Sequence, residues 1–179
     1  GDPVAEILAQ VKEDPEIGIL VLGAGNDKSG PGPLVTAMSR NSGSLPVPIT
    51  IVPGDLSKER MGVADADIRK LKGKVKHLFH LAAVYDLSAS AEDQQLANVE
   101  GTRNAVRFAE AISAGCFHHV SSIAAAGMYD GVFREDMFEE AGALDHPYFL
   151  TKHESEGLVR KEKDMKWRIY RPGMVVGHS

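Results

Sequence analysis

Apolar residues recur along the chain with two spacings, one typical of helices and the other typical of buried strands. The helical i, i+3, i+4, i+7 spacing is formed near the N-terminus by Val4, Ile7, Leu8 and Val11. A helix there would carry one apolar stripe. Residues 17–22 then form a short, nearly continuous apolar run, as expected of a parallel strand covered on both faces. This order of elements predicts an α/β fold class.

The later elements follow from the same spacings and from residues that start or stop helices. Pro147 is tolerated in a first helical turn, where its missing N–H would have no partner, so a helix is expected there, continuing to about Lys163. The other predicted helices are at 34–40, 65–72 and 92–114, and the predicted strands are at 47–52, 75–81, 116–120 and 167–170. Strands separated by helices imply a parallel sheet with right-handed crossovers and helices on both faces.

Composition excludes several classes of protein. The chain has 179 residues, enough for one well-buried domain and too few for two ordinary ones. No apolar run approaches the ~20 residues of a membrane span. A net charge of −5, without a block of Lys and Arg, argues against nucleic acid as a partner. The single cysteine, Cys116, lies in a predicted strand and no secretory segment is visible, so a cytoplasmic location is expected.

Tyr148 and Lys152 are four residues apart in the helix that begins at Pro147, so both side chains lie on one helical face. A nearby positive charge lowers the pKa of a phenol, which would let Tyr148 act as a general acid or base. The alternative is a pair on a solvated helix face, which many helices carry.

Two serines follow the predicted strand at 116–120 and precede a loop of small residues. In a parallel sheet this loop lies at the carboxyl edge of the strands, where ligands bind. Ser122 is therefore a candidate to hold a substrate oxygen beside the tyrosine. The alternative, a serine that only caps backbone groups in the turn, applies to Ser121.

No metal site is expected from the seven histidines. His118 and His119 are adjacent on a strand and point to opposite faces, so they cannot share an ion. His77 and His80 are three residues apart and also diverge.

Five motifs stand in order between residues 62 and 179. They are His80-Leu81-Ala82-Ala83, the helical segment from Ala97 to Thr102, Val120-Ser121-Ser122, the run from Tyr148 to Lys152, and Arg171-Pro172-Gly173-Met174-Val175-Val176-Gly177. In this order they resemble the extended short-chain dehydrogenase/reductase family, in detail its fatty-acyl-reductase and 3-beta-hydroxysteroid-like members.

That resemblance implies roles for individual residues. Ser122 would orient the substrate, Tyr148 would transfer the proton, and Lys152 would lower the pKa of the tyrosine and hold the nicotinamide ribose. The resemblance also implies that the cofactor, NAD or NADP, passes close to a further group of residues. These are Ala82, Ala83, Pro172 and Val175.

Four glycines follow the first predicted strand, where backbone N–H groups and a helix dipole can receive a phosphate. They are Gly23, Gly25, Gly30 and Gly32. Their spacing is not the Gly-x-x-Gly-x-x-Gly of the reductase family. Residues 1–60 instead resemble the C-terminal half of a universal stress protein, through the helix, the apolar run at 19–23, the glycine loop and the strand at 47–53. In nucleotide-binding members of that family this loop holds the phosphates of ATP. Pro33 follows Gly32 here, so ATP is a weaker expectation than NAD or NADP, and glycines that serve only a tight turn are the alternative.

Together the two resemblances predict a recombined or engineered hybrid, with residues 1–60 from one family, residues 61–179 from the other and the seam within 53–62. A start at Gly1 without methionine fits an excised segment. The strands of the first part would complete one domain over residues 1–179, a three-layer Rossmann or flavodoxin-like sandwich with a five-stranded parallel sheet of order 2-1-3-4-5. Asp55 would then lie near the adenosine end, where an acid favours an unphosphorylated ribose, although a turn-forming Asp is the alternative.

Three functional hypotheses remain open. The first is a nucleotide-binding-type scaffold without efficient turnover, because the chain stops at Ser179 and catalysis needs a positioned substrate. The second is an NAD(P)-dependent oxidoreductase that acts on a carbonyl or hydroxyl group through Ser122, Tyr148 and Lys152. The third is a self-associating ATP-binding module that forms a homodimer through an edge strand from Val47 to Val52.

Overall fold

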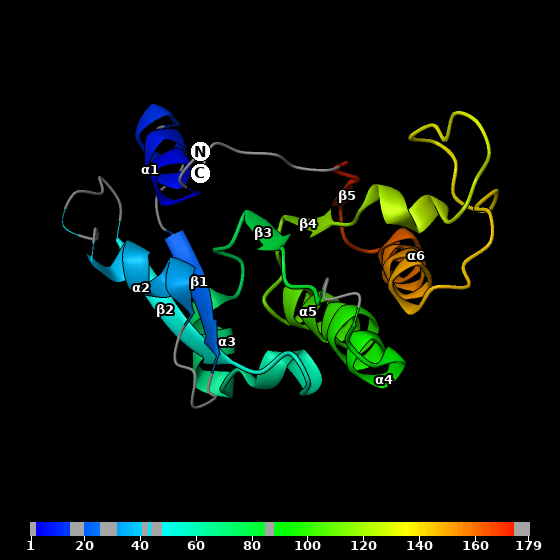
Figure 1. Cartoon of the computed structure of the whole chain (residues 1–179). Coiled ribbons are helices and arrows are strands. Elements are labelled where there is room, and N and C mark those ends of the chain that lie inside the picture. Colours follow the sequence, from blue (N-terminus) through cyan, green and yellow to red (C-terminus); the bar gives the residue numbers. More distant parts are fainter. Residues whose placement is uncertain are drawn as a thin grey trace. The chain divides into compact units, whose positions relative to one another are not determined.

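The computed structural model describes residues 3–14, 20–25, 32–40, 43, 48–84 and 88–173. The described residues up to Asp55 form one compact unit and those from Leu56 onward form another (Figure 1). A single domain over residues 1–179 stays a prediction. None of the helices in the described ranges is long and apolar enough to cross a membrane.

The first unit contains the helix, strand, helix and strand that the apolar pattern predicts. Its elements are α1 (Pro3–Glu13), β1 (Leu20–Gly25), α2 (Pro33–Arg40) and β2 (Ile49–Gly54). The two strands pair in parallel, with Leu20 opposite Ile49. Val4 of α1 is buried with Leu22 and Met38 in a small core, which confirms the predicted apolar stripe. The homodimer through the strand at 47–52 stays a prediction.

The second unit contains the rest of the predicted elements. They are α3 (Asp65–Leu71), β3 (His77–His80), α4 (Ala91–Gln94), α5 (Gly101–Ala111), β4 (Cys116–Val120), α6 (Pro147–Arg160) and β5 (Trp167–Tyr170), with 3-10 turns at Glu59–Gly62 and Ile123–Ala126. Its three strands are parallel in the order β3-β4-β5. The predicted orders 2-1 and 3-4-5 thus occur in two separate sheets, and the pairing of β1 with β3 that would join them stays a prediction.

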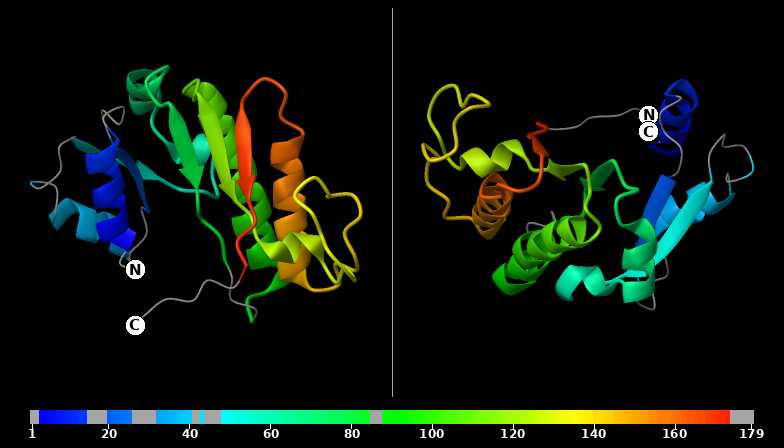
Figure 2. Two further views of the ribbon diagram at one scale, coloured as in Figure 1. Left: turned by 90° about the horizontal axis from the view of Figure 1, so that it is seen from above. Right: turned by 180° about the vertical axis from the view of Figure 1, so that it is seen from behind.

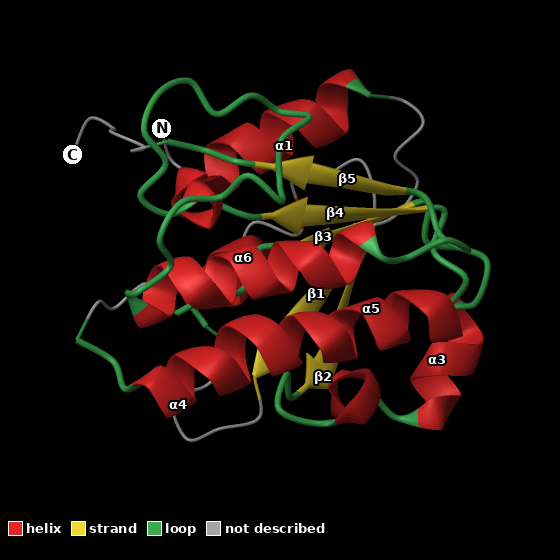
Figure 3. Ribbon diagram, turned by 90° about the vertical axis from the view of Figure 1, so that its right-hand side faces the viewer, coloured by secondary structure: helices red, strands yellow, loops and turns green. Residues whose placement is uncertain are grey.

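Helices α5 and α6 run side by side along the β3-β4-β5 sheet (Figure 3). Their apolar residues form a core with the fully buried Phe117 of β4. The buried members are Ala105, Val106, Ala109, Phe117 and Val159. This packing covers one face of the sheet and fixes the position of α6 relative to the ends of β4 and β5.

The predicted helix at 92–114 contains a π-helical turn, Gln95–Glu100, between α4 and α5. The Thr102 hydroxyl donates to the Asn98 carbonyl at 2.6 Å and so competes with the ordinary helical hydrogen bond of that carbonyl. Spacing of apolar residues does not reveal such a turn. Because π turns are frequent at functional sites, this one directs attention to Asn98.

Candidate active site

Loops follow each strand of the β3-β4-β5 sheet at its carboxyl edge. They lie at 81–84, 121–127 and 171–173. Two backbone hydrogen bonds join the second loop to the end of β5 and to the third loop. The Ser121 N–H donates to the Tyr170 carbonyl at 2.8 Å, and the Ile123 N–H donates to the Pro172 carbonyl at 3.2 Å. Parallel sheets bind ligands at this edge, so it is the place to examine the predicted site residues.

Helix α6 begins where the sequence predicts. Pro147 occupies its first turn, and the His146 ring accepts a hydrogen bond from the Tyr148 N–H at 3.1 Å. The Tyr148 side chain is partly buried, and its hydroxyl has no hydrogen-bond partner among the described residues. The phenol at the start of this helix therefore keeps its proton available for a ligand.

Lys152 lies one turn further along α6 and is only 3% exposed. Its Nζ donates to the Val120 carbonyl at 3.1 Å, and its other N–H groups have no partner in the described part of the chain. Burial lowers the pKa of Lys152 to about 8, although the Glu156 carboxylate raises it. At neutral pH the amine thus remains mostly protonated, with donors left for a ligand.

The capping serine is Ser122, whereas the sequence suggests Ser121 for that role. Ser122 caps the 3-10 turn at Ile123–Ala126, because its Oγ accepts from the Ala124 N–H at 3.1 Å. Ser121 is not the capping residue, since its buried hydroxyl donates to Glu156 Oε2 at 2.8 Å. A hydroxyl that accepts a bond still has its own O–H, and that of Ser122 has no acceptor among the described residues.

Asn98 holds the loop after β3 against α6, a role that the sequence did not reveal. Its side chain accepts from the Val84 N–H at 2.8 Å and donates to the Val84 carbonyl at 3.1 Å. It also donates to the Thr151 hydroxyl at 3.1 Å, beside Lys152. Asn98 is only 2% exposed. Its position inside one of the five sequence motifs was the one feature of the sequence that could have indicated this role.

Two buried histidines lie on the face of the sheet that α5 and α6 cover. The rings of His80 and His119 stack with centroids 5.7 Å apart. Burial, and then the charge of Lys152, lowers the pKa of His80 to about 4. Burial, and then His80 and Lys152, lowers the pKa of His119 to about 3. Both rings are therefore neutral at pH 7. His80 Nε2 donates to Thr102, whose own proton is already given to the Asn98 carbonyl.

Glu156 is a fully buried carboxylate on α6. It accepts from Arg160 Nε at 2.8 Å and from Arg171 Nη2 at 2.5 Å, in addition to Ser121. Burial raises the pKa of Glu156, but these hydrogen bonds outweigh burial and hold that pKa below its usual value. The charged carboxylate thus joins α6 to the ends of β4 and β5.

Arg171 also fastens the loop at 128–145, which lies beside α6 (Figure 2). Its Nη2 donates to the Met137 carbonyl at 2.7 Å and its Nη1 donates to the Arg134 carbonyl at 3.2 Å. On the same loop, the Phe138 ring stacks on His153 of α6 at 4.1 Å. The loop is therefore anchored to the helix that carries Tyr148 and Lys152.

The predicted cofactor residues fall in both compact units. In the first, Gly23 and Gly25 lie at the end of β1, Gly32 precedes α2 with a φ of 86°, and Asp55 follows β2. Gly30 lies outside the described residues. A strand, a glycine-containing connection, a helix and a parallel strand follow one another there, as in dinucleotide-binding folds.

In the second unit, Ala82 is exposed and Ala83 is partly buried in the loop after β3. The Pro172 carbonyl lies in the loop after β5, bonded to the loop that carries Ser122. Val175 lies outside the described residues. Considered by itself, the first unit thus contains a glycine-rich connection. The second unit contains the buried Lys152 amine, which has unused donors among the described residues.

An NAD-binding family model described as "Male sterility protein" matches residues 5–179. The chain belongs to this family. The match runs through residues 53–62 and includes nearly all of the segment compared above with a stress protein. This match gives no support to a stress-protein origin, to a hybrid chain or to an ATP site. It supports a reductase-like chain with an NAD(P) site.

One curated relative is similar to a large part of this chain, and two solved structures share its fold. Aldehyde reductase lnbA of Aspergillus flavus is 32% identical over 138 residues, which are 71% of this chain and 14% of that protein. The terminal R domain from the myxalamid PKS-NRPS biosynthetic pathway has a TM-score of 0.71 at 21% identity, over 98% of this chain and 46% of that chain. UDP-glucuronic acid 4-epimerase from Bacillus cereus in complex with NAD has a TM-score of 0.66 at 21% identity, over 97% of this chain and 54% of that chain. The predicted Rossmann-like α/β fold is confirmed.

Proposed function

We propose that this chain is the NAD(P)-binding part of a reductase that converts a carbonyl group to an alcohol. The observation that carries the proposal is the pair at the start of α6: a phenol with an unused O–H, followed one turn later by a buried amine with unused N–H groups. This pair lies at the carboxyl edge of a parallel sheet in a chain of an NAD-binding family. The family and the aldehyde reductase relative support this oxidoreductase alternative better than a scaffold without turnover.

In this proposal the bound NADH or NADPH supplies a hydride to the carbonyl carbon. Tyr148 donates its hydroxyl proton to the carbonyl oxygen as that oxygen gains charge. Lys152 stabilises the resulting phenolate through its positive charge and donates to a ribose hydroxyl. Ser122 directs its unused O–H at the same carbonyl oxygen and so positions the substrate.

The residues around this pair favour a charged Lys152 and a fixed helix. The neutral rings of His80 and His119 add no positive charge beside the amine at pH 7. The Glu156 carboxylate, on the same helix, favours the protonated amine. Both effects support the role proposed for Lys152.

For the cofactor, Gly23, Gly25 and Gly32 are proposed to hold the pyrophosphate and Asp55 the adenosine ribose. A carboxylate directly after the second strand favours NAD, because it repels the 2′-phosphate of NADP. For the substrate, the name of the aldehyde reductase supports an aldehyde.

The proposal is tested by following NADH and NADPH oxidation by the purified chain with a series of aldehydes. Tyr148→Phe should lower kcat at least about 100-fold, the usual share of a general acid, and leave the cofactor Kd unchanged. Tyr129→Phe is the matched control, since Tyr129 lies in the anchored loop and should keep the wild-type rate. Equal rates for wild type and Tyr148→Phe would refute the proposed proton donor.

A further inference from the structure

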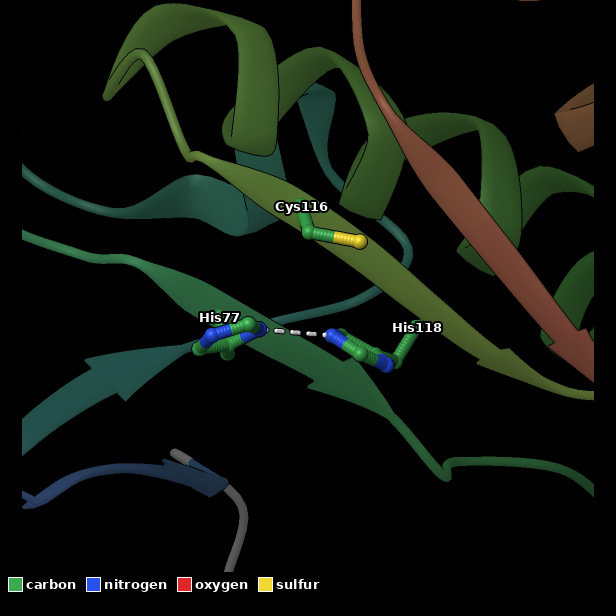
Figure 4. A group of neighbouring side chains, drawn as sticks. All are labelled: His77, Cys116 and His118. Carbon is green, nitrogen blue, oxygen red and sulfur yellow. Dashed lines mark hydrogen bonds between the residues drawn. The ribbon is translucent and has the colours of Figure 1, made fainter. Parts of the chain in front are cut away.

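His77, Cys116 and His118 form a cluster on β3 and β4, on one face of the second unit's sheet (Figure 4). The parallel register places His77 opposite Cys116 and Phe79 opposite His118, so the three side chains project from the same face. His77 Nδ1 lies 2.9 Å from His118 Nε2. One donor atom from each of the three residues lies within 4.8 Å of the others.

This cluster could not be predicted from spacing along the chain, because its members come from two strands. Alternation within one strand separates His118 from His119, and that argument holds. It does not exclude a partner on the neighbouring strand, where register decides which side chains meet. His77 and His118 are 41 residues apart in sequence and adjacent in the sheet.

We propose that His77, Cys116 and His118 bind one zinc ion, with a water molecule as the fourth ligand. Two imidazoles and a thiolate are typical zinc donors, and three protein ligands with one open position form a recurrent zinc site. Cys116 is the only cysteine of the chain, so no disulfide within the chain competes for its sulfur.

The distances require only small movements. Zinc bonds of about 2.0–2.1 Å to nitrogen and 2.3 Å to sulfur place tetrahedral ligands about 3.3 Å apart for two nitrogens and about 3.5 Å apart for nitrogen and sulfur. The two ring nitrogens, now 2.9 Å apart, must separate by about 0.4 Å. The sulfur, within 4.8 Å of both, must approach by no more than about 1.3 Å, which side-chain rotation can supply.

The His118 ring is already held in a suitable orientation. Its Nδ1 is bonded to the Tyr170 hydroxyl at 2.8 Å, and the Phe79 ring stacks on it at 4.2 Å. When His118 Nδ1–H donates to the Tyr170 oxygen, the lone pair lies on Nε2 and faces His77. A hydrogen bond to the second ring nitrogen is the usual support of a metal-bound histidine.

The cluster is open to solvent on one side. His77 is exposed, and a surface hollow of about 710 Å³ includes His77 and Cys116 in its lining, together with Glu162 and Trp167. This hollow lies at the amino edge of the strands, away from the loops that carry Ser122 and Tyr148. Zinc binding here would cross-link β3 to β4 and release the thiol proton of Cys116 to solvent. The inference is independent of the proposed reductase chemistry.

The test is a titration of the tag-free, metal-free chain with CoCl₂, followed by absorbance, and with ZnCl₂, followed by calorimetry. We expect one ion per chain and a thiolate-to-cobalt charge-transfer band, which in this chain only Cys116 can produce. Cys116→Ser should abolish the band, and His77→Ala and His118→Ala should each weaken zinc binding at least about 100-fold. Tyr170→Phe should weaken it about tenfold, as loss of a supporting hydrogen bond does.

Absence of the charge-transfer band at stoichiometric cobalt would overturn the proposal, and the wild-type spectrum decides this even if a variant fails to fold. Zinc binding that is unchanged in Cys116→Ser or His77→Ala would also overturn it. Circular dichroism of each variant separates loss of binding from loss of fold.

Discussion

Arg171→Met tests whether the buried Glu156 carboxylate holds the candidate active site together. The substitution removes three donor contacts to Glu156 and two contacts to backbone carbonyls of the loop at 128–145. Removing one partner of a buried ion pair costs about 3–5 kcal/mol, because the other charge is left without compensation. Arg160 and Ser121 still donate to Glu156, so we expect a loss near 3 kcal/mol in the free energy of unfolding.

The assay is urea unfolding at pH 7, followed by far-UV circular dichroism. Arg134→Met is the matched control, because its ion pair with Asp136 is exposed and should contribute no more than about 1 kcal/mol. Acid gives a second signature. The folded pKa of Glu156 lies below its usual value, so its contribution to stability is lost as the pH falls through that folded value. This acid-dependent loss should shrink in Arg171→Met. A loss below about 1 kcal/mol, equal to that of the control, would show that the contacts between Arg171 and Glu156 do not stabilise the fold.

Two further predictions concern buried or strained positions. The folded pKa of His80, about 4, lies below its ordinary value of 6.5, so the unfolded state binds more protons between these pH values and stability should fall as the pH drops from 6.5 to 4. The difference for His80 is worth roughly 3 kcal/mol. His80→Gln should therefore reduce the slope of unfolding free energy against pH in that window, and the lowered pKa of His119 accounts for a slope that remains. An unchanged slope would contradict the burial of a neutral ring. Gly127 has a φ of 59°, and a Cβ there would lie 2.6 Å from the Ala143 carbonyl oxygen. Gly127→Ala should therefore lower the free energy of unfolding by at least about 2 kcal/mol in a thermal unfolding experiment. Gly173→Ala is the control, because no atom would lie within 4 Å of its Cβ, and it should change stability by less than about 0.5 kcal/mol. Equal effects of the two substitutions would show that the close approach is relieved at no cost.

The regular elements of the second unit could be predicted because its apolar spacing is unambiguous. The strands at 116–120 and 167–170 match β4 and β5, and Pro147 marks the start of α6. The π-helical turn at Gln95–Glu100 could not be predicted, since it depends on a side chain that bonds a carbonyl within the helix. The spacing of apolar residues does not indicate whether that hydrogen bond forms.

The stress-protein comparison of the first sixty residues, which the family match does not support, has a physical reason. A short apolar strand, a glycine-rich connection, a helix and a second parallel strand serve many nucleotide-binding α/β folds. Glycine spacing distinguishes them only weakly, because several loops can bring backbone N–H groups to a phosphate. The family match over residues 5–179 supplied what the local pattern lacked.

The buried polar contacts of the candidate site could not be predicted from the sequence either. Ser121 and Glu156 are 35 residues apart and Glu156 and Arg171 are 15 apart, so no local spacing connects them. Charged residues on a helix ordinarily face solvent, whereas here the helix turns Lys152 and Glu156 inward. By contrast, Tyr148 and Lys152 could be paired in advance because a helix repeats every 3.6 residues.

The most direct test of the central claim is calorimetric titration of the purified chain with NADH, NADPH and ATP. We expect saturable binding of NADH or NADPH at one site per chain and no binding of ATP. Lys152→Met should weaken cofactor binding at least tenfold, because the buried amine loses its donors. Lys161→Met is the matched control, because this exposed lysine lies directly after the end of α6, and it should leave cofactor binding unchanged. A cooperatively folded chain that binds neither NADH nor NADPH, or that binds ATP in preference, would be incompatible with the proposed NAD(P)-dependent reductase.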